Sequence, residues 1–167
     1  MISERKAMSV ILPGSYDPVT LGHLDVIKRA AREYDEVYAV IFTNPEKTYT
    51  FSLEERVKML ILATDELDNV LVSYSSGLVI DYMREHGIEK IVKGYRDERD
   101  VEYERPQAEY NRLHGGYETE LLECSSGFSE ISSTEARRRI LSGEDLADIL
   151  PCEVIDYIKE RAKLNKN

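Results

Sequence analysis

Short apolar segments alternate with amphipathic ones along almost the whole chain. Residues 9–12 read Ser-Val-Ile-Leu and stop at Pro13-Gly14, a pattern typical of a buried strand. Residues 37–42 form the clearest continuous apolar run, which predicts a central strand. Further strands are predicted at residues 70–72, 90–93 and 118–124.

A helical period begins at Thr20. From there, apolar and aromatic side chains recur at intervals that place them on one face of a helix; they are Leu24, Ile27, Ala31 and Tyr34. We therefore expect a helix that buries this face, with Thr20 standing where a helix N-cap would.

Two later helices carry a start signal, the capping box. In this motif a Ser or Thr side chain and a Glu three residues later satisfy each other's backbone N–H groups. Ser52 and Glu55 have this spacing, and so do Ser132 and Glu135. The two pairs predict helix starts after Ser52 and after Ser132.

Three more helices are indicated. One spans residues 78–86 and ends at Gly87, which suits a left-handed helix end, and another follows Pro151. Residues 100–113 are helical by composition, but Pro106 lies inside this stretch. An interior proline costs a helix about 3 kcal/mol, so we expect a kink there or a new helix that starts at Pro106.

Strands that alternate with helices require crossover connections, and these produce a parallel sheet. We predict an α/β fold: a Rossmann-like doubly wound sheet of about five parallel strands with helices on both faces. A single domain would span residues 1–167. Such sheets bind ligands beyond the carboxyl ends of their strands, which directs attention to the residues that follow the strands.

The charge balance narrows the range of partners. The chain of 167 residues has 32 acidic and 22 basic side chains, a formal net charge of -10. An affinity for nucleic acid would come from neutralising phosphates, so this balance argues against a nucleic-acid binder. It leaves room for small phosphorylated substrates, because local positive charge in a cleft can coexist with an acidic surface.

The cysteine content and the length of the apolar runs argue against a disulfide-rich protein, a cysteine-rich zinc site and a membrane protein. Cys124 and Cys152 are far apart and too few for a disulfide framework or a cysteine-rich zinc site. No apolar run approaches the roughly 20 residues that a membrane span needs. Residues 1–8 are polar and lack the apolar stretch of an export signal. We therefore expect a cytoplasmic protein with no membrane partner.

The segment after the first strand holds the first candidate chemistry. Residues 13–18 read Pro-Gly-Ser-Tyr-Asp-Pro, and these are ordinary turn residues. Gly14, however, allows close backbone approach to a ligand, and His23 lies in the first turn of the helix after Thr20. The amides and dipole at that position favour an anion, and a phosphate would supply one.

These residues carry a resemblance to a known family. Residues 14–18 (Gly-Ser-Tyr-Asp-Pro), followed by Thr20-Leu21-Gly22-His23, resemble the signature of nucleotidyltransferases that transfer a nucleoside monophosphate from a triphosphate. The resemblance implies that His23 stabilises the transition state at the α-phosphate. A second motif of that superfamily is present at residues 131–137, Ile-Ser-Ser-Thr-x-x-Arg. Its Arg137 is expected to reach the triphosphate.

Within this superfamily the chain resembles the phosphopantetheine adenylyltransferases from about Met8 to the C-terminal helix. The match rests on residues 44–47 (Asn-Pro-x-Lys), 51–56, 93–96 (Lys-Gly-x-Arg) and 100–111. The resemblance implies adenylyl transfer from ATP to 4'-phosphopantetheine, giving dephospho-coenzyme A and pyrophosphate. It also implies Mg²⁺ accompanying ATP, a homohexamer, and coenzyme A as a regulator. No carboxylate cluster in the sequence suggests a protein cage for the metal.

The resemblance assigns site residues by position. Residues implied in catalysis are His23, Lys47 and Arg96. Those implied to contact phosphopantetheine are Ser15, Lys47, Val79 and Lys93. Those implied to surround ATP are Ser15, Tyr16, His23, Gly94, Tyr95, Arg96, Glu104, Phe128, Ser129, Glu130, Ile131, Ser132, Ser133 and Thr134.

Some positions depart from the family pattern and keep alternatives open. Lys93 stands where the family has arginine, which would bind phosphate with a two-pronged fork. Pro106, Gln107 and Tyr110 replace residues expected to line the pantetheine arm. Residues 133–140 resemble nicotinate- or nicotinamide-mononucleotide adenylyltransferases, although those typically use a tryptophan and this chain has none. A non-catalytic nucleotide-binding module on the same fold is the third possibility.

Overall fold

The computed structural model describes residues 6–165, so the expectation about an export signal in residues 1–8 lies mostly outside it. Strands occupy β1 (Lys6–Gly14), β2 (Tyr34–Phe42), β3 (Val70–Ser75), β4 (Lys90–Tyr95) and β5 (Thr119–Glu123). Helices occupy α1 (Leu21–Glu33), α2 (Leu53–Thr64), α3 (Val79–His86), α4 (Glu98–Gly115), α5 (Ser133–Ser142) and α6 (Cys152–Leu164). No helix within the described residues is long and apolar enough to span a membrane.

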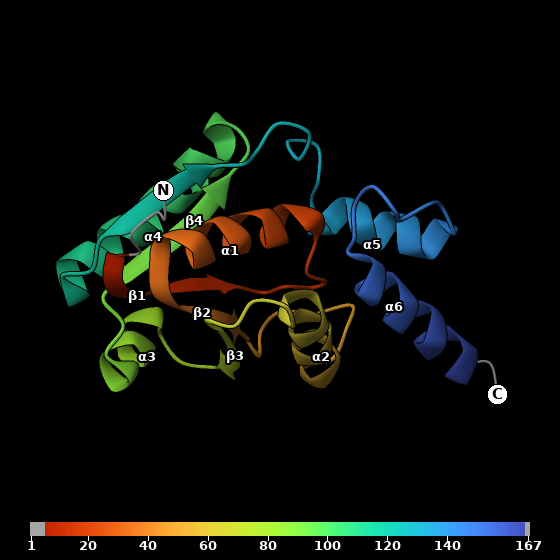
Figure 1. Cartoon of the computed structure of the whole chain (residues 1–167), viewed down its shortest axis with the longest axis horizontal. Coiled ribbons are helices and arrows are strands. Elements are labelled where there is room, and N and C mark those ends of the chain that lie inside the picture. The colour runs from red at the N-terminus through yellow and green to blue at the C-terminus, as the bar shows by residue number, and fades with distance from the viewer. Residues whose placement is uncertain (1–5, 166–167) are drawn as a thin grey trace.

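The strands form a single parallel sheet in the order β3-β2-β1-β4-β5. The chain therefore builds the sheet outward from β1 to β3, then returns to the other side of β1 and continues with β4 and β5 (Figure 1). The predicted Rossmann-like sheet is confirmed. The direction of winding reverses between β1 and β4, and sheets of this kind bind ligands at such a switch point.

The apolar side chains of β1 divide between the two faces of the sheet. Val10 and Leu12 belong to a core shared with α1, α2, α5 and α6, whereas Ile11 packs into a smaller core with α3. Alternate residues of a strand point to opposite faces, so one strand anchors both layers. Helices on both faces are thus confirmed, and α1 lies across the sheet in Figure 1.

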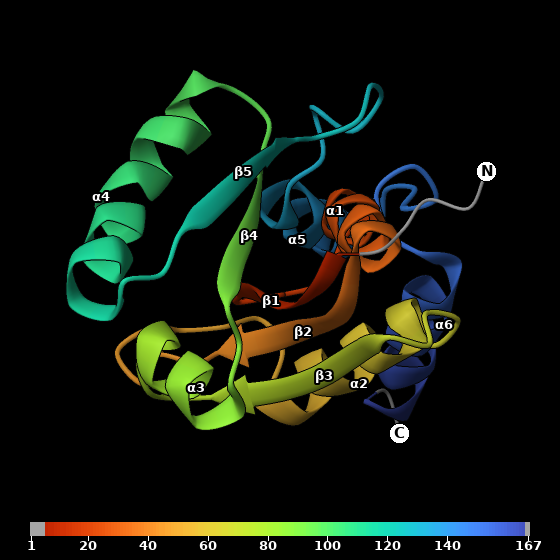
Figure 2. The ribbon, with the colours of Figure 1, turned by 60° about the vertical axis from the view of Figure 1, so that its left-hand side comes forward.

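Helix α4 buries little of its length. Figure 2 shows it beside β4 and β5, apart from the β2–β3 side of the sheet. Asn111 is its one buried residue. The helix runs through Pro106 without interruption, so the new helix predicted to start there is wrong. Both ends are capped: the Asp97 side chain accepts from the Asp100 N–H, and the backbone N–H of Gly116, with φ 72°, closes the helix.

Two local predictions differ from the structure. Tyr34 is not on α1: it adopts extended φ/ψ values and begins β2, although its side chain is fully buried in the core that α1 also covers. Ser132 caps α5 as predicted, but Glu135 does not complete the capping box. The Glu135 carboxylate instead binds Arg138 and Arg139, at 2.7 Å and 3.0 Å.

Candidate active site

A cleft of about 1010 Å³ opens at the switch between β1 and β4. The ends of β1, β2 and β4, the first turns of α1 and α5, and one side of α4 contribute to its walls. Predicted site residues that line it are Ser15, Tyr16, His23, Lys47, Val79, Lys93, Gly94, Tyr95, Arg96, Glu104, Phe128, Ile131, Ser132, Ser133 and Thr134. Ser129 and Glu130 belong to the same β5–α5 segment but do not line the cleft.

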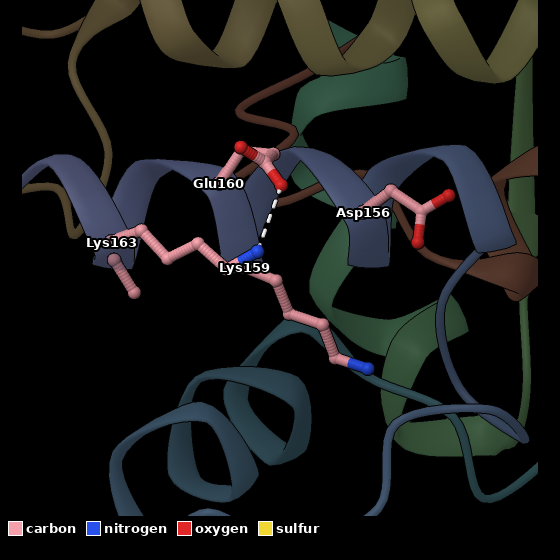
Figure 3. Close-up of a pocket in the computed structure, with 5 residues that line it drawn as sticks. Asp156, Lys159, Glu160 and Lys163 are labelled. Carbon is pink, nitrogen blue, oxygen red and sulfur yellow. Dashed lines mark hydrogen bonds and ion pairs between the residues drawn. The ribbon is translucent and has the colours of Figure 1, made fainter.

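A second hollow lies on α6. Figure 3 shows its lining side chains along that one helix, where Glu160 and Lys163 form an ion pair of 3.2 Å. Asp156 and Lys159 complete the labelled set. All of its lining residues belong to α6, and no strand end or helix N-terminus contributes. The switch-point cleft is therefore the candidate active site.

His23 is held in one orientation by the start of its own helix. It is the third residue of α1, and its Nδ1 accepts a hydrogen bond from the Thr20 N–H at 3.0 Å. The His23 N–H in turn donates to Thr20 Oγ1 at 3.3 Å, so the two residues form a reciprocal cap. Because Nδ1 is an acceptor, the neutral ring carries its proton on Nε2. The half-buried ring thus has a donor left for a ligand in the cleft it lines.

The surroundings keep His23 neutral. Burial, together with the smaller effect of the positive charges of Lys93 and Arg96, lowers the pKa of the ring to about 4. The ring therefore remains an uncharged hydrogen-bond donor at neutral pH.

This environment predicts an acidic titration midpoint. By proton NMR, the His23 ring should titrate near pH 4. The unfolded chain would protonate it near the ordinary value of about 6.5, so His23 should reduce stability as pH falls from about 6.5 toward 4. A measured midpoint near 6.5 would contradict this placement of the half-buried, hydrogen-bonded ring.

Gly94 sets the distance between α1 and β4. A Cβ atom at this position would lie 2.7 Å from Val26 Cγ2. Val26 is buried on α1, one turn after His23, so the glycine allows the helix to approach the strand closely. The position of His23 over the cleft depends on this contact.

Lys93 and Arg96 are each paired with a carboxylate of α4. Lys93 Nζ lies 3.0 Å from Glu104 Oε2, and Arg96 Nε lies 3.2 Å from Asp100 Oδ2. Lys47 is exposed on the β2–α2 loop, and no partner for its ammonium is found within residues 6–165. The cleft therefore combines two neutralised cations with one available cation.

Two buried charged side chains fasten the loops after β1 and β2 to each other. The Asp17 carboxylate accepts from the N–H groups of Thr50 and Phe51, both at 2.9 Å. Arg56 is 2% exposed and donates to the carbonyls of Ser15 (3.0 Å) and Phe51 (3.2 Å). These contacts hold the loop that carries Ser15 against the loop that carries Lys47.

The three consecutive arginines of α5 have structural partners. Arg137 donates to the Asp17 carbonyl at 2.8 Å and to Thr134 Oγ1 at 3.1 Å, and it does not line the cleft. The expectation that it reaches the triphosphate directly thus has no support in its position. Arg138 and Arg139 bind acidic side chains, among them Glu135.

Two polar side chains of the cleft wall lack hydrogen-bond partners. Asn111 of α4 is 4% exposed, and within the described part of the chain its side-chain amide has none. Thr119 Oγ1, at the start of β5, is fully buried and also has none. Polar groups of this kind are ordinarily satisfied. The Asn111 amide, which lines the cleft, is therefore an expected contact point for a polar ligand, whereas Thr119 Oγ1 is too deeply buried for a direct contact.

A family model described as cytidylyltransferase-like matches residues 11–139, which run from the end of β1 through most of α5. The chain belongs to the cytidylyltransferase-like family.

One relative indicates which members of this family the chain resembles. The chain is 39% identical over 155 residues to the phosphopantetheine adenylyltransferase of Corynebacterium efficiens, with 92% of this chain and 98% of the relative covered. The predicted resemblance to phosphopantetheine adenylyltransferases is thereby confirmed. The similarity extends beyond the two family motifs to nearly the full length of both proteins.

Sequence reasoning did not single out every residue that shapes this cytidylyltransferase-like site. Arg56 precedes Met59 and Leu60 by three and four residues, so helical spacing already places it on the buried face of α2. The sequence carries no comparable signal for Asp25, whose hydrogen-bond partner Ser125 lies 100 positions away, or for Thr119, whose burial depends on distant segments.

Proposed function

We propose that this chain transfers the adenylyl group of ATP to 4'-phosphopantetheine, giving dephospho-coenzyme A and pyrophosphate. The observation that carries the proposal is the convergence of His23, Lys93, Arg96 and the first turn of α5 on one switch-point cleft. The near-full-length similarity to a phosphopantetheine adenylyltransferase supports the choice of substrates.

The reaction needs no covalent enzyme intermediate. A phosphate oxygen of the acceptor attacks the α-phosphorus of ATP and forms a new P–O bond. The bond from the α-phosphorus to the oxygen that bridges to the β-phosphate breaks, and pyrophosphate leaves with that electron pair. Catalysis then consists of positioning the two substrates and stabilising charge on the transferring group.

His23 supplies the neutral donor in this scheme. Its Nδ1 is occupied by the Thr20 N–H, so Nε2–H is the group available to an oxygen of the α-phosphate. A donor with a fixed orientation costs little reorganisation when negative charge develops on that oxygen. The uncharged state follows from the lowered pKa of the ring.

The cations divide between the two substrates. Lys93 is proposed to bind the acceptor phosphate, together with Lys47 and Ser15, and Arg96 to bind the triphosphate. Lys93 and Arg96 must exchange Glu104 and Asp100 for phosphate oxygens to do so. The unpartnered amide of Asn111, which lines the cleft, fits an acceptor whose arm carries amide groups.

Magnesium is part of the proposal as a companion of ATP. Within residues 6–165 no group of three His, Cys, Asp or Glu side chains is placed to hold a metal ion. A Mg²⁺ ion would therefore take its ligands from the phosphates and water, and would neutralise charge on the triphosphate. The homohexamer and the binding of coenzyme A also remain proposals that rest on the family resemblance.

An acceptor assay tests the proposed function. Pyrophosphate release from ATP with Mg²⁺ should require 4'-phosphopantetheine and should not occur with nicotinate or nicotinamide mononucleotide. Release with a mononucleotide instead would assign the chain to the alternative adenylyltransferases. If neither acceptor supports release but ATP still raises the unfolding temperature, the chain is a nucleotide-binding module.

A further inference from the structure

The segment that connects β5 to α5 is attached to α1 at two neighbouring points. Asp25, two residues after His23, accepts hydrogen bonds from the N–H (3.1 Å) and the Oγ (2.9 Å) of Ser125. Arg29, one turn later on α1, donates to the Glu123 carbonyl at 2.6 Å and lies 3.6 Å from the Asp25 carboxylate. The Asp25 side chain is only 12% exposed, so these contacts are shielded from water.

Ser125 is the first link in a series of turns that ends at α5. Its carbonyl accepts from the Phe128 N–H, and the Phe128 carbonyl accepts from the Ile131 N–H, both at 3.1 Å. Ile131 directly precedes Ser132, the N-cap of α5. On the other side, the N–H of Cys124 donates to a carbonyl of β4 at 2.8 Å. A displacement of Ser125 would therefore move Phe128 and Ile131, which line the cleft.

We propose that Asp25 is a positioning residue for the nucleotide. It fixes residues 128–134, through Ser125, relative to His23 on the same helix. The inference rests on the proposed function, in which this segment surrounds ATP. A carboxylate suits the task because both of its oxygens accept charge-assisted hydrogen bonds from Ser125, whereas an amide has one oxygen and no negative charge.

The test compares variants that alter this contact without touching the substrates. In Asp25→Asn and in Ser125→Ala, the Kd of Mg²⁺–ATP, measured by calorimetry without acceptor, should rise about tenfold. The KM for 4'-phosphopantetheine should stay within about twofold, because the acceptor side of the cleft is unchanged. Ser125→Thr keeps both donors and should bind ATP as the unmodified protein does.

A matched control removes the same charge elsewhere. Asp35→Asn, at an exposed position near the start of β2, should leave the ATP Kd unchanged. In the double variant of Asp25→Asn with Ser125→Ala, the loss of ATP affinity should be smaller than the two single losses combined, because both substitutions weaken the contact between the same two residues.

Three results would overturn the proposal. The first is an unchanged ATP Kd in Asp25→Asn, and the second is additive losses in the double variant. The third is an equal weakening of both substrates, which would indicate a general loss of structure. If Asp25→Asn does not fold, Ser125→Ala decides alone. The Kd of ATP is measured without any transfer of the adenylyl group. If the protein binds ATP but transfers nothing, the proposed function is refuted, and the comparison of ATP affinities between the variants remains valid.

Discussion

His23→Ala is expected to lower kcat by about 10²–10⁴-fold, the range typical of losing a positioned catalytic donor. The ATP Kd should stay within about threefold, because the donor acts mainly on charge that develops in the transition state. Steady-state kinetics with both substrates, together with calorimetric ATP titration, measures the two effects separately. The fold should persist, since the Thr20 side chain still caps α1.

The chain offers a matched histidine for comparison. His114 is exposed near the C-terminus of α4, where it stacks on Tyr110 with 4.1 Å between ring centroids. His114→Ala should leave kcat unchanged. A His23→Ala protein whose kcat falls by less than about threefold would remove His23 from the mechanism.

Gly94→Ala is the second change with a large expected effect. The added Cβ would meet Val26 Cγ2 at 2.7 Å, closer than carbon atoms pack, so α1 must move away from β4. We expect a loss of about 1–3 kcal/mol in the free energy of unfolding, as for other overpacked cores. Because His23 moves with α1, kcat should fall by about 10² as well. Urea unfolding and steady-state kinetics measure the two losses.

Two further variants separate the clash from a general intolerance of change. Gly77→Ala places its Cβ at an ordinary 3.6 Å from Ser75 Oγ and should alter the free energy of unfolding by less than about 0.5 kcal/mol. Adding Val26→Ala to Gly94→Ala removes the obstructing methyl groups, so the double variant should lose less stability than the sum of the single losses. Strict additivity would show that the contact with Val26 is not the cause.

The regular elements could be predicted because their signals are local. Strand runs, helical spacing and caps such as Ser52 each involve residues a few positions apart, and alternation of strands with helices then restricts the topology. Tyr34 shows where this reasoning fails. Its side chain enters the same core as Ile27 and Ala31, so the apolar spacing continues although the backbone has already become extended. The spacing of apolar residues indicates which side chains are buried, but it does not determine the backbone conformation.

The site was predictable as a set of residues but not as a set of contacts. The family motifs bring the cleft residues together on one sheet edge, yet they say nothing of how Lys93 and Arg96 are paired. Contacts such as Asp17 with Phe51, or Asp25 with Ser125, join residues 34 and 100 positions apart. Such pairs depend on how the layers pack, which no local pattern encodes.

Lys93 is paired with Glu104, and Arg96 with Asp100, so a phosphate that binds to these cations would replace their carboxylate partners. An entering phosphate does not meet two free positive charges; it must displace a carboxylate from each of them. A singly charged anion would interact with Lys93 and Arg96 no more favourably than their carboxylate partners do, whereas the electrostatic attraction of a doubly charged phosphate would be stronger. We therefore expect these paired cations to favour doubly charged phosphates over singly charged anions, whatever the rest of the substrate.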